Sequence, residues 1–200
     1  MESSELTAVI VTLKSEDKIF SCIDSIPNQV KIIIVENSNN VKFKENIENK
    51  YKNVKCILSG ENKGYAVANN IGLRKVKTKF ALVLNPDTTL QKDTINNFFQ
   101  SVKINKDFWL IGPSNNQSSN HSFEKNKYVE VENLKGFAIF FNVEKFQRAF
   151  FDENFFLFFE EIDLCKRVKK NKGKIYLSKE ILIKHEGSSS VQGNNYHELE

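Results

Sequence analysis

Short apolar runs alternate with amphipathic stretches through the first hundred residues. The first run, AVIVTL at residues 8–13, is brief, apolar and rich in β-branched side chains, which is typical of a buried strand. Three further runs of this kind follow at residues 31–35, 54–59 and 80–84. Helical patterns separate the four runs, over about residues 15–25, 43–51 and 65–75. Strands spaced by helices in this way predict βαβ crossovers, and therefore a mixed, mostly parallel α/β sheet flanked by helices.

The second hundred residues are less regular. A helix is predicted over about residues 93–103, a short one over 143–150, and a third over 160–171, which has acids at its start, basic residues at its end and Gly173 as its stop. Strands are predicted at residues 109–112, 174–177 and 181–184, with one or two more within 128–141 around Gly136. The polar stretch 114–127 predicts a mobile loop. We expect one domain over residues 1–190 and a flexible C-terminal tail over 191–200.

Composition and charge remove several classes of protein. The 200 residues include 29 Lys and Arg against 25 Asp and Glu, and 40% are hydrophobic, which indicates a globular chain and excludes a fibre. The net charge of +4 is spread evenly, so no nucleic-acid partner is expected. The 3 cysteines form no CxxC pair, which argues against a disulfide framework or a zinc knuckle. The apolar run at 8–13 is too short for a membrane span, and we expect a cytoplasmic protein.

Polar or small residues stand where each of the first four predicted strands ends. These positions are Thr12, Glu36-Asn37, the segment 59–65 and Asn85-Pro86-Asp87. Ligands of parallel sheets bind beyond the carboxyl ends of the strands, so this convergence predicts a ligand site there. The chain has no GxGxxG after its first strand, no GxxxxGK[ST] and no HExxH, which excludes the dinucleotide fingerprint, the P-loop and the zinc protease motif.

The tripeptide Asn85-Pro86-Asp87 has two interpretations. An aspartate on a rigid element at the ligand edge can hold a divalent ion that bridges a diphosphate. All three residue types also favour ordinary turns, so a turn without a metal is the alternative.

The segment 62–72, NKGYAVANNIG, is more informative. Gly64 permits a close approach of the backbone just before a helix whose N-terminus favours anions. Asn69 and Asn70 are poor helix formers, which indicates that contacts outside the helix hold them. A loop followed by a weak helix in an Asn-rich chain is the alternative.

Three carboxylates crowd the start of the predicted helix at 160–171. Glu160, Glu161 and Asp163 complement the helix dipole, and Asp163 can pair with Arg167 one turn later. One of these carboxylates, next to a Phe-rich segment, can instead serve as a general base whose pKa is raised. His185 follows the last predicted strand and is either a metal or phosphate ligand or a structural histidine.

Phenylalanine accounts for 17 of the 23 aromatic residues, and ten of the 17 lie between Phe137 and Phe159. Burial in the core is the plain interpretation, because aromatic side chains are mostly buried. A surface that faces a membrane or an acceptor is the alternative.

Taken together, seven segments resemble family 2 glycosyltransferases of the GT-A fold, and especially their rhamnosyltransferase-like branch, which builds bacterial surface polysaccharides. In order they are AVIVTL, IIIVENSNN, ENKGYAVANNIGL, FALVLNPDTTL, LKGFAIFF, FDENFFLFFEEIDLCKRV and ILIKHEGSSS, and they cover most of residues 8–190. The resemblance implies transfer of a sugar, rhamnose being one candidate, with inversion from a nucleotide-diphospho-sugar donor to a glycan or lipid-linked acceptor. It also implies a divalent metal, Mn²⁺ or Mg²⁺, and a place at the inner face of a membrane.

The resemblance also assigns roles to residues. Asp87 matches a metal-binding acid and His185 a histidine near the metal and diphosphate. Glu161 falls where the family usually has its Asp base, with Asp163 or Glu160 as substitutes. The positions matched to nucleotide-sugar binding are Thr12, Glu36, Asn62, Gly64, Tyr65, Asn69, Asn70, Asn85 and Gly136.

Two other classes of function stay open at this point. A catalytically weak or inactive nucleotide-sugar-binding module of a polysaccharide assembly complex is one, because the chain is short for this family and carries Glu rather than Asp at the base position. A nucleotidyltransferase on a related scaffold is the other. Neither the sugar, the nucleotide, the acceptor nor the oligomeric state follows from the sequence.

Overall fold

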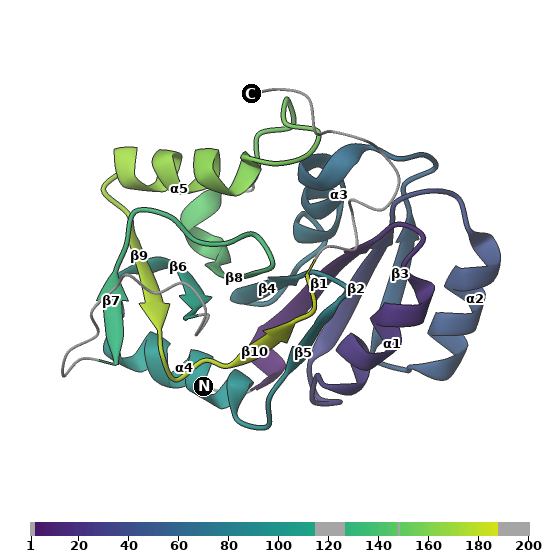
Figure 1. The fold of residues 1–200 in the computed structure, drawn as a ribbon, viewed down its shortest axis with the longest axis horizontal. Coiled ribbons are helices and arrows are strands. Elements are labelled where there is room, and N and C mark those ends of the chain that lie inside the picture. Colours follow the sequence, from purple (N-terminus) through teal and green to yellow (C-terminus); the bar gives the residue numbers. More distant parts are fainter. Residues whose placement is uncertain (1–2, 115–126, 148, 188–200) are drawn as a thin grey trace.

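Eight strands form one twisted sheet in the computed structural model, in the order β3-β2-β1-β4-β8-β6-β9-β7 (Figure 1). The structure describes residues 3–114, 127–147 and 149–187. The strands of the sheet are β1 (Leu6–Thr12), β2 (Lys31–Glu36), β3 (Val54–Leu58), β4 (Phe80–Leu84), β6 (Phe108–Pro113), β7 (Tyr128–Glu130), β8 (Ala138–Asn142) and β9 (Lys174–Ser178). The helices are α1 (Glu16–Asp24), α2 (Val41–Lys50), α3 (Gly64–Leu73), α4 (Thr94–Ile104) and α5 (Glu160–Lys170), with 3-10 turns at Ser3–Glu5 and Val143–Phe146.

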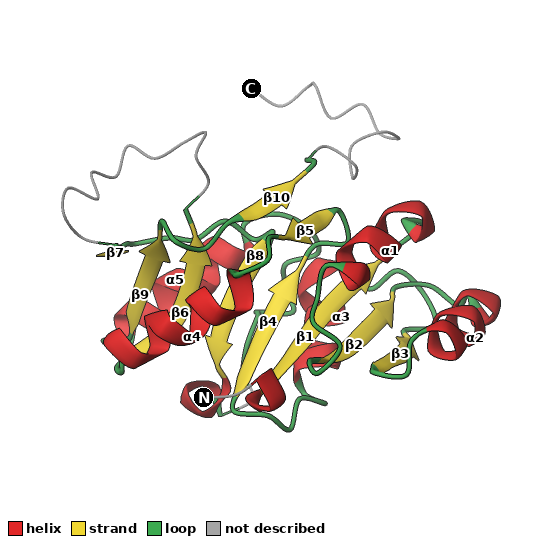
Figure 2. Cartoon of the chain, turned by 90° about the horizontal axis from the view of Figure 1, so that it is seen from below, coloured by secondary structure: helices red, strands yellow, loops and turns green. Residues whose placement is uncertain are grey.

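The pairing of the strands confirms a mixed, mostly parallel sheet. Strand β1 pairs in parallel with β2 and β4, β2 with β3, and β6 with β9. Strand β8 lies antiparallel between β4 and β6, and β7 runs antiparallel to β9. Because the first four strands are parallel, their carboxyl ends share one edge, toward which the arrowheads of β1, β2 and β4 point in Figure 2.

Alternate residues of the strands pack into two hydrophobic layers, one on each face of the sheet. In β1, Ala8 and Ile10 pack with residues of α1, α2 and α4, whereas Val9 packs with residues of α3 and α5. Figure 2 shows α1 and α4 over one face and α3 and α5 over the other. Since helices cover both faces of the central strands, these strands are continuously apolar in sequence, which is the pattern that predicted them.

The Phe-rich segment is core in its first part and surface in its last. Phe140 is fully buried, with its ring centroid 4.7 Å from that of Phe98 and 5.3 Å from that of Phe80. By contrast Phe156, Phe158 and Phe159 are 57%, 56% and 65% exposed. Burial in the core is therefore confirmed for the first part of the segment. The last part is exposed, and what it faces stays a prediction.

Several local predictions were wrong or incomplete. The helix predicted over 143–150 is only the 3-10 turn Val143–Phe146, because the chain turns at Gln147, which has a left-handed φ of 46°. Ser15 precedes α1 but does not cap it with its side chain, since its hydroxyl donates to the carbonyl of Leu13 at 3.0 Å. At the end of α5 it is Lys172, with φ 58°, that takes the left-handed conformation rather than Gly173.

A second, two-stranded sheet was only half predicted. Strand β5 (Thr88–Leu90) pairs antiparallel with β10 (Ile183–His185) beside the carboxyl edge of the main sheet. The strand predicted at 181–184 corresponds to β10, whereas β5 has no counterpart in the prediction because three residues carry too little periodicity to be recognised.

Two predictions fall outside what can be compared. The flexible tail at 191–200 and residues 115–126 of the predicted loop lie beyond the described residues. Among residues 3–114, 127–147 and 149–187, no helix is both long enough and apolar enough to cross a lipid bilayer.

Candidate functional site

The turn after β4 brings two predicted metal ligands together. Asn85-Pro86-Asp87 closes as a turn in which the backbone N and the hydroxyl of Thr88 both donate to the Asn85 carbonyl, at 3.2 and 2.7 Å. Asp87 is 8% exposed, and its Oδ1 lies 3.3 Å from Nε2 of His185. The pairing of β10 with β5 brings His185 opposite Thr88. Residues almost a hundred positions apart therefore meet at the carboxyl edge.

The ring of Phe137 sets the orientation of His185. The two rings are stacked, with centroids 4.7 Å apart and planes inclined by 8°. Phe137 also accepts, through its carbonyl, a hydrogen bond of 2.9 Å from the backbone N of Asn85. A single residue before β8 thus supports both the turn and the histidine, and sequence reasoning had treated it only as one of many phenylalanines.

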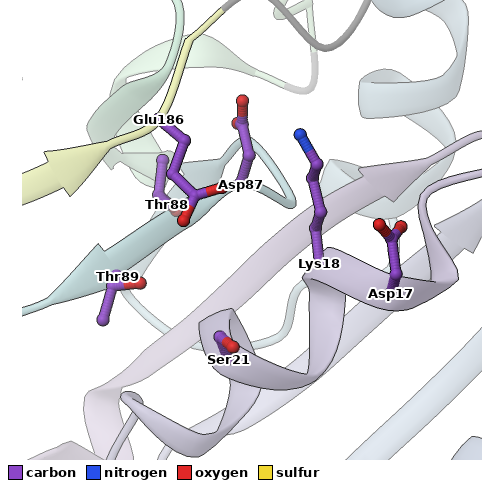
Figure 3. Close-up of a pocket in the computed structure, with 7 residues that line it drawn as sticks. All are labelled: Asp17, Lys18, Ser21, Asp87, Thr88, Thr89 and Glu186. Atoms are coloured by element: carbon purple, nitrogen blue, oxygen red, sulfur yellow. The ribbon is translucent and has the colours of Figure 1, made fainter.

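A small cavity of about 220 Å³ lies beside Asp87, between α1 and β5 (Figure 3). Its lining residues are Asp17, Lys18 and Ser21 from α1, and Asp87, Thr88, Thr89 and Glu186 from the other side. Lys18 and Asp87 extend toward the same side of this cavity in Figure 3. Lys18 is the one cation among these seven residues, so it adds a site for negative charge next to the carboxylates.

The pair of Asp87 and His185 suits a divalent ion that also binds a substrate phosphate. A carboxylate oxygen and an imidazole nitrogen are both ligands that Mn²⁺ accepts, and Mg²⁺ is commonly held by one or two carboxylates together with substrate phosphates. No group of three or more His, Cys, Asp or Glu side chains that could hold a metal occurs in the described part of the chain. A metal here would therefore need further ligands from a substrate.

Tyr65, near the start of α3, connects the turn to the segment before β8. Its hydroxyl donates to the carbonyl of Gly136 at 2.8 Å and lies 3.4 Å from Oδ1 of Asn85. Burial raises the pKa of Tyr65 far above its ordinary value, and the negative charges of Glu160 and Glu161 raise it further. The phenol is therefore a neutral hydrogen-bond donor at every physiological pH.

The three carboxylates at the start of α5 have different surroundings. Glu160 is 5% exposed, burial and the neighbouring Glu161 raise its pKa, and its Oε2 has no hydrogen-bond partner among the described residues. Asp163 is paired with Arg167, whose Nε lies 2.6 Å from Oδ2, while the guanidinium also donates to the Phe150 carbonyl at 2.7 Å. Asp163 is therefore already engaged.

Glu161 has neither the burial of Glu160 nor the ion pair of Asp163. It is partly exposed and accepts no hydrogen bond from a residue of the described ranges. Its side chain lies against Gly136, where an added Cβ would be 3.7 Å from the Glu161 carboxyl carbon. The Tyr65 hydroxyl, the Gly136 backbone and Glu161 therefore lie next to one another.

A second cluster surrounds Asn37 at the ends of β2 and β3. The Asn37 side chain accepts from the backbone N of Lys63 at 3.1 Å and donates to Oδ1 of Asn62 at 3.0 Å. That same Oδ1 accepts from the backbone N of Gly64 at 3.1 Å. Sequence reasoning placed Asn37 among the polar residues at the strand ends but, unlike Asn62 and Gly64, did not match it to nucleotide-sugar binding.

Glu36 and Thr12 lie at neighbouring strand ends. The Glu36 carboxylate is 1% exposed and accepts from the Ser38 hydroxyl at 2.6 Å and from the backbone N of Asn40 at 2.9 Å. Thr12 accepts from the backbone N of Asn37 at 2.7 Å, and its buried Oγ1 has no partner in the described structure. The carboxylate of Glu36 thus shapes the loop before α2, and its contact with a nucleotide stays a prediction.

Asn70 holds the segment that leads to α5, and Asn69 bonds within its own helix. The Asn70 side chain accepts from the backbone N of Phe151 at 3.0 Å and donates to its carbonyl at 2.8 Å, so it pairs with both backbone groups of one residue. Asn69 donates to the carbonyl of Tyr65 at 3.0 Å. The expected contacts outside the helix are therefore present for Asn70, whereas the one hydrogen bond of Asn69 lies within α3. Binding of a ligand by either asparagine stays a prediction.

Gly64 lies directly under the same loop. Its φ of +79° is left-handed, and a Cβ there would collide with the Phe156 carbonyl, to which the backbone N of Tyr65 donates at 2.7 Å. Only glycine permits this close approach. The loop that carries the exposed phenylalanines is therefore held by α3 at two points, Phe151 and Phe156.

These contacts connect most of the predicted site. One network joins Asp87, His185, Asn85, Tyr65, Gly136, Glu160 and Glu161, and the adjoining loops hold Thr12, Glu36, Asn62 and Gly64. Asn69 and Asn70 support the network from α3, and Asp163 is drawn to Arg167. The arrangement can bind an anion and a cation together and can accept a proton a short distance away.

Comparison with known proteins gives a consistent result. The hexosyltransferase Agl10 of low-salt glycan biosynthesis in Haloferax volcanii is 23% identical over 193 residues, which are 83% of this chain and 62% of that protein. S. aureus TarS 1–349 in complex with UDP-GlcNAc has a TM-score of 0.70 at 18% identity, over 92% of this chain and 59% of that one. The mannosyltransferase PcManGT of Pyrobaculum calidifontis, in complex with GDP-Man and Mn²⁺, has a TM-score of 0.72 at 13% identity, over 86% of this chain and 53% of that one.

The chain thus spans less than two thirds of the length of each of these three proteins. The structural neighbours have the GT-A glycosyltransferase fold, which confirms the expected fold. Residues 7–165, well over half of the chain, match the model of the family described as Glycosyl transferase family 2. The chain therefore belongs to glycosyl transferase family 2.

Proposed function

We propose that this chain transfers a sugar, with inversion and with the help of a divalent metal, from a nucleotide-diphosphate donor to a hydroxyl group of a glycan or lipid-linked acceptor. The observation that carries the proposal is a chain of contacts. Asp87 lies beside His185, and the Tyr65 hydroxyl lies 3.4 Å from Asn85 of the turn that carries Asp87. Tyr65 also donates to Gly136, against which Glu161 lies. These contacts connect a site for a charged leaving group with a site for a proton acceptor.

Donor binding is supported by the site and by the relatives. Lys18 supplies positive charge beside the cavity at Asp87, and a bound cation would offset the three carboxylates of its lining. TarS and PcManGT have been solved with UDP-GlcNAc and GDP-Man. We infer that a nucleotide-diphospho-sugar occupies the carboxyl edge of this sheet, and rhamnose stays one candidate for the sugar.

Mn²⁺ or Mg²⁺ fits the ligand types at this edge, and Asp87 and His185 would hold it. When bound, the ion would neutralise the charge that develops on the departing diphosphate. The chain's own residues prepare this position: Thr88 fixes the turn that carries Asp87, and Phe137 fixes the ring of His185.

Glu161 is assigned the role of general base. The acceptor hydroxyl oxygen forms a bond to the anomeric carbon while the bond from that carbon to the diphosphate oxygen breaks, and the hydroxyl proton passes to the Glu161 carboxylate. Attack from the face opposite the leaving group inverts the configuration. The Tyr65 hydroxyl keeps the Gly136 backbone in place beside the base by donating a hydrogen bond to its carbonyl. Because the pKa of Tyr65 is raised, the phenol stays protonated and does not compete with Glu161 for the acceptor's proton.

The acceptor would approach from the side of the loop before α5. Three phenylalanines and Leu157 are exposed there in one run that ends next to Glu160. Such a surface suits an acceptor with an apolar part, which supports a lipid-linked acceptor and a location at the inner face of the membrane.

Release of nucleoside diphosphate tests the proposal. Purified protein is incubated with UDP-, GDP- and dTDP-sugars, dTDP-rhamnose included, with Mn²⁺ or Mg²⁺ and with lipid-linked and free glycan acceptors. We expect release that requires acceptor, is abolished by EDTA and falls in Glu161→Gln. Tight donor binding without turnover over the whole acceptor set would instead favour a nucleotide-sugar-binding module, and release of pyrophosphate from a nucleoside triphosphate would favour a nucleotidyltransferase.

A further inference from the structure

A second hollow, which we call the basal hollow, lies at the opposite edge of the sheet from Asp87. It has a volume of about 570 Å³ and is lined by Lys79, Phe80, Val102, Lys103, Lys106, Phe108 and Asn142. Phe80 and Phe108 begin β4 and β6, and Asn142 ends the antiparallel β8, so all three mark the amino-terminal edge of the parallel strands. A volume of this size is within the range of small-molecule sites.

The charge of the basal hollow is entirely positive. Lys79, Lys103 and Lys106 are its charged lining residues, and none of the three forms an ion pair with a residue of the described ranges. The Lys79 ammonium lies 5.4 Å from the centroid of the Phe80 ring. Lys103 is in the last turn of α4, where it complements the helix dipole, but neither Lys79 nor Lys106 lies in a helix. The dipole therefore accounts for only one of the three charges.

Asn142 supplies a second, independent feature. It is 7% exposed, and its Nδ2 donates to the Phe108 carbonyl at 3.3 Å. Its Oδ1 is buried and has no partner in the described structure. A buried carbonyl oxygen without a donor is costly, so a ligand that brings a hydroxyl or N–H group to it would be stabilised.

We propose that the basal hollow binds a phosphorylated polyol, with the phosphate held by the three lysines and a hydroxyl group donated to Oδ1 of Asn142. Lysine binds phosphate as a point charge with several donors. A polyol also carries hydroxyl donors at a distance from its phosphate, whereas the only donor of inorganic phosphate is on the phosphate itself. The site is at the other edge of the sheet from the proposed catalytic centre, so it stands independently of the proposed function. A soluble polyol phosphate and the glycerol-phosphate headgroup of a lipid share this chemistry.

Two probes distinguish these sources. Glycerol 3-phosphate is titrated into the full chain by calorimetry in the presence of EDTA, and vesicles of phosphatidylglycerol are compared with vesicles of phosphatidylcholine by co-sedimentation. We expect binding to at least one anionic probe, weakened as salt concentration rises. Lys103→Gln/Lys106→Gln should bind that probe at least tenfold more weakly, whereas the matched variant Lys42→Gln/Lys170→Gln, with the same change of charge on exposed helical positions, should bind within twofold of wild type.

Two further variants make the test specific. Asp87→Asn should leave binding of the probe unchanged, because it alters only the opposite edge. Asn142→Ala, checked for folding by circular dichroism, should bind glycerol 3-phosphate no better than inorganic phosphate, whereas wild type prefers the polyol phosphate. The proposal is overturned if neither millimolar glycerol 3-phosphate nor phosphatidylglycerol vesicles bind. It is also overturned if the two lysine double variants lose binding equally.

Discussion

The two edges of the sheet carry opposite charge in different ways. At the carboxyl edge Asp87 and Glu160 are almost completely buried, and the surroundings of Asp87 are fixed by a hydrogen-bonded turn, a ring stack and a second small sheet. At the amino edge Lys103 and Lys106 are exposed and without ion pairs among the described residues. Charge that is buried and oriented can act on one bond of one substrate, whereas exposed lysines attract any anion and are screened by salt.

The largest effect is expected from a change at Asp87. Asp87→Asn keeps the shape of the side chain and removes its charge, so we expect release of nucleoside diphosphate to fall about 10⁴-fold, corresponding to several kcal/mol of lost charge stabilisation. Steady-state turnover with the preferred donor measures this. The control is Asp93→Asn, an exposed aspartate just before α4, which should stay within twofold of wild type. Equal activities of the two variants would remove Asp87 from the mechanism.

The second largest loss of activity is expected from a change at Glu161. Glu161→Gln removes the proton acceptor, and we expect kcat to fall about 10³-fold with little change in the KM of the donor. Asp163→Asn should cost less than tenfold, because Asp163 is paired with Arg167 and serves the helix. A larger loss in Asp163→Asn than in Glu161→Gln would transfer the role of base to Asp163.

Comparison of two glycines separates the cost of a steric clash with a neighbour from the cost of a left-handed backbone. Gly64 and Gly60 both have left-handed φ values, +79° and +86°, but only Gly64 has a neighbour within reach of a Cβ, the Phe156 backbone. We expect Gly64→Ala to lower the free energy of unfolding by about 3 kcal/mol and Gly60→Ala by about 1 kcal/mol. Urea denaturation of both variants measures the difference. Equal losses would show that the loop moves aside easily and is not held by α3.

The asparagine pair of α3 provides a smaller contrast. Asn70→Ala leaves the two backbone groups of Phe151 without their partner, so we expect a loss of about 2 kcal/mol, and Asn69→Ala, which removes one bond within the helix, a loss of about 1 kcal/mol. Chemical denaturation again serves as the measurement. A greater loss in Asn69→Ala would contradict the assignment of Asn70 as the residue that holds the loop.

The smallest effect concerns the pH dependence at Glu160. Its pKa is raised in the folded protein, so deprotonation costs more in the folded than in the unfolded state, and stability is lost as pH rises above the ordinary pKa of Glu, about 4.3. Glu160→Gln removes this cost, and we expect its Tm to exceed that of wild type by a few degrees at pH 8, with the difference vanishing near pH 4. A difference that does not change with pH would mean that the carboxylate is not destabilised by burial.

The sequence revealed the regular half of this molecule better than the irregular half. The parallel strands were predicted because both faces of β1, β2 and β4 are buried, which makes each a continuous apolar run. Strand β5 was missed because its three residues are ordered by contact with β10, a relation between distant segments. The same reason applies to Phe137, whose stacking on His185 depends on how two far ends of the chain meet.

The candidate site shows the same division. Asp87, Glu161 and His185 were candidates from their residue types and their places beside predicted elements, and the family resemblance supplied their roles, which stay predictions. Asn37 was noted only as a polar residue at a strand end, and Lys18 was not singled out, because a single Asn after a strand or a single Lys in a helix has no distinctive spacing. The exposure of Phe156, Phe158 and Phe159 also could not be read from composition, since it depends on the left-handed backbone at Phe158 and Phe159 and on the anchoring of the loop to α3.

The central claim is that Asp87 anchors a metal-dependent nucleotide site at the carboxyl edge, and thermal shift tests it most directly. Wild type and Asp87→Asn are heated with UDP, GDP or dTDP, each with and without Mn²⁺; a ligand that binds only the folded protein must raise its Tm. We predict that at least one nucleotide raises the Tm of wild type more with Mn²⁺ than without, and that Asp87→Asn loses this metal-dependent increase. An equal Mn²⁺-dependent increase in both proteins would contradict the account.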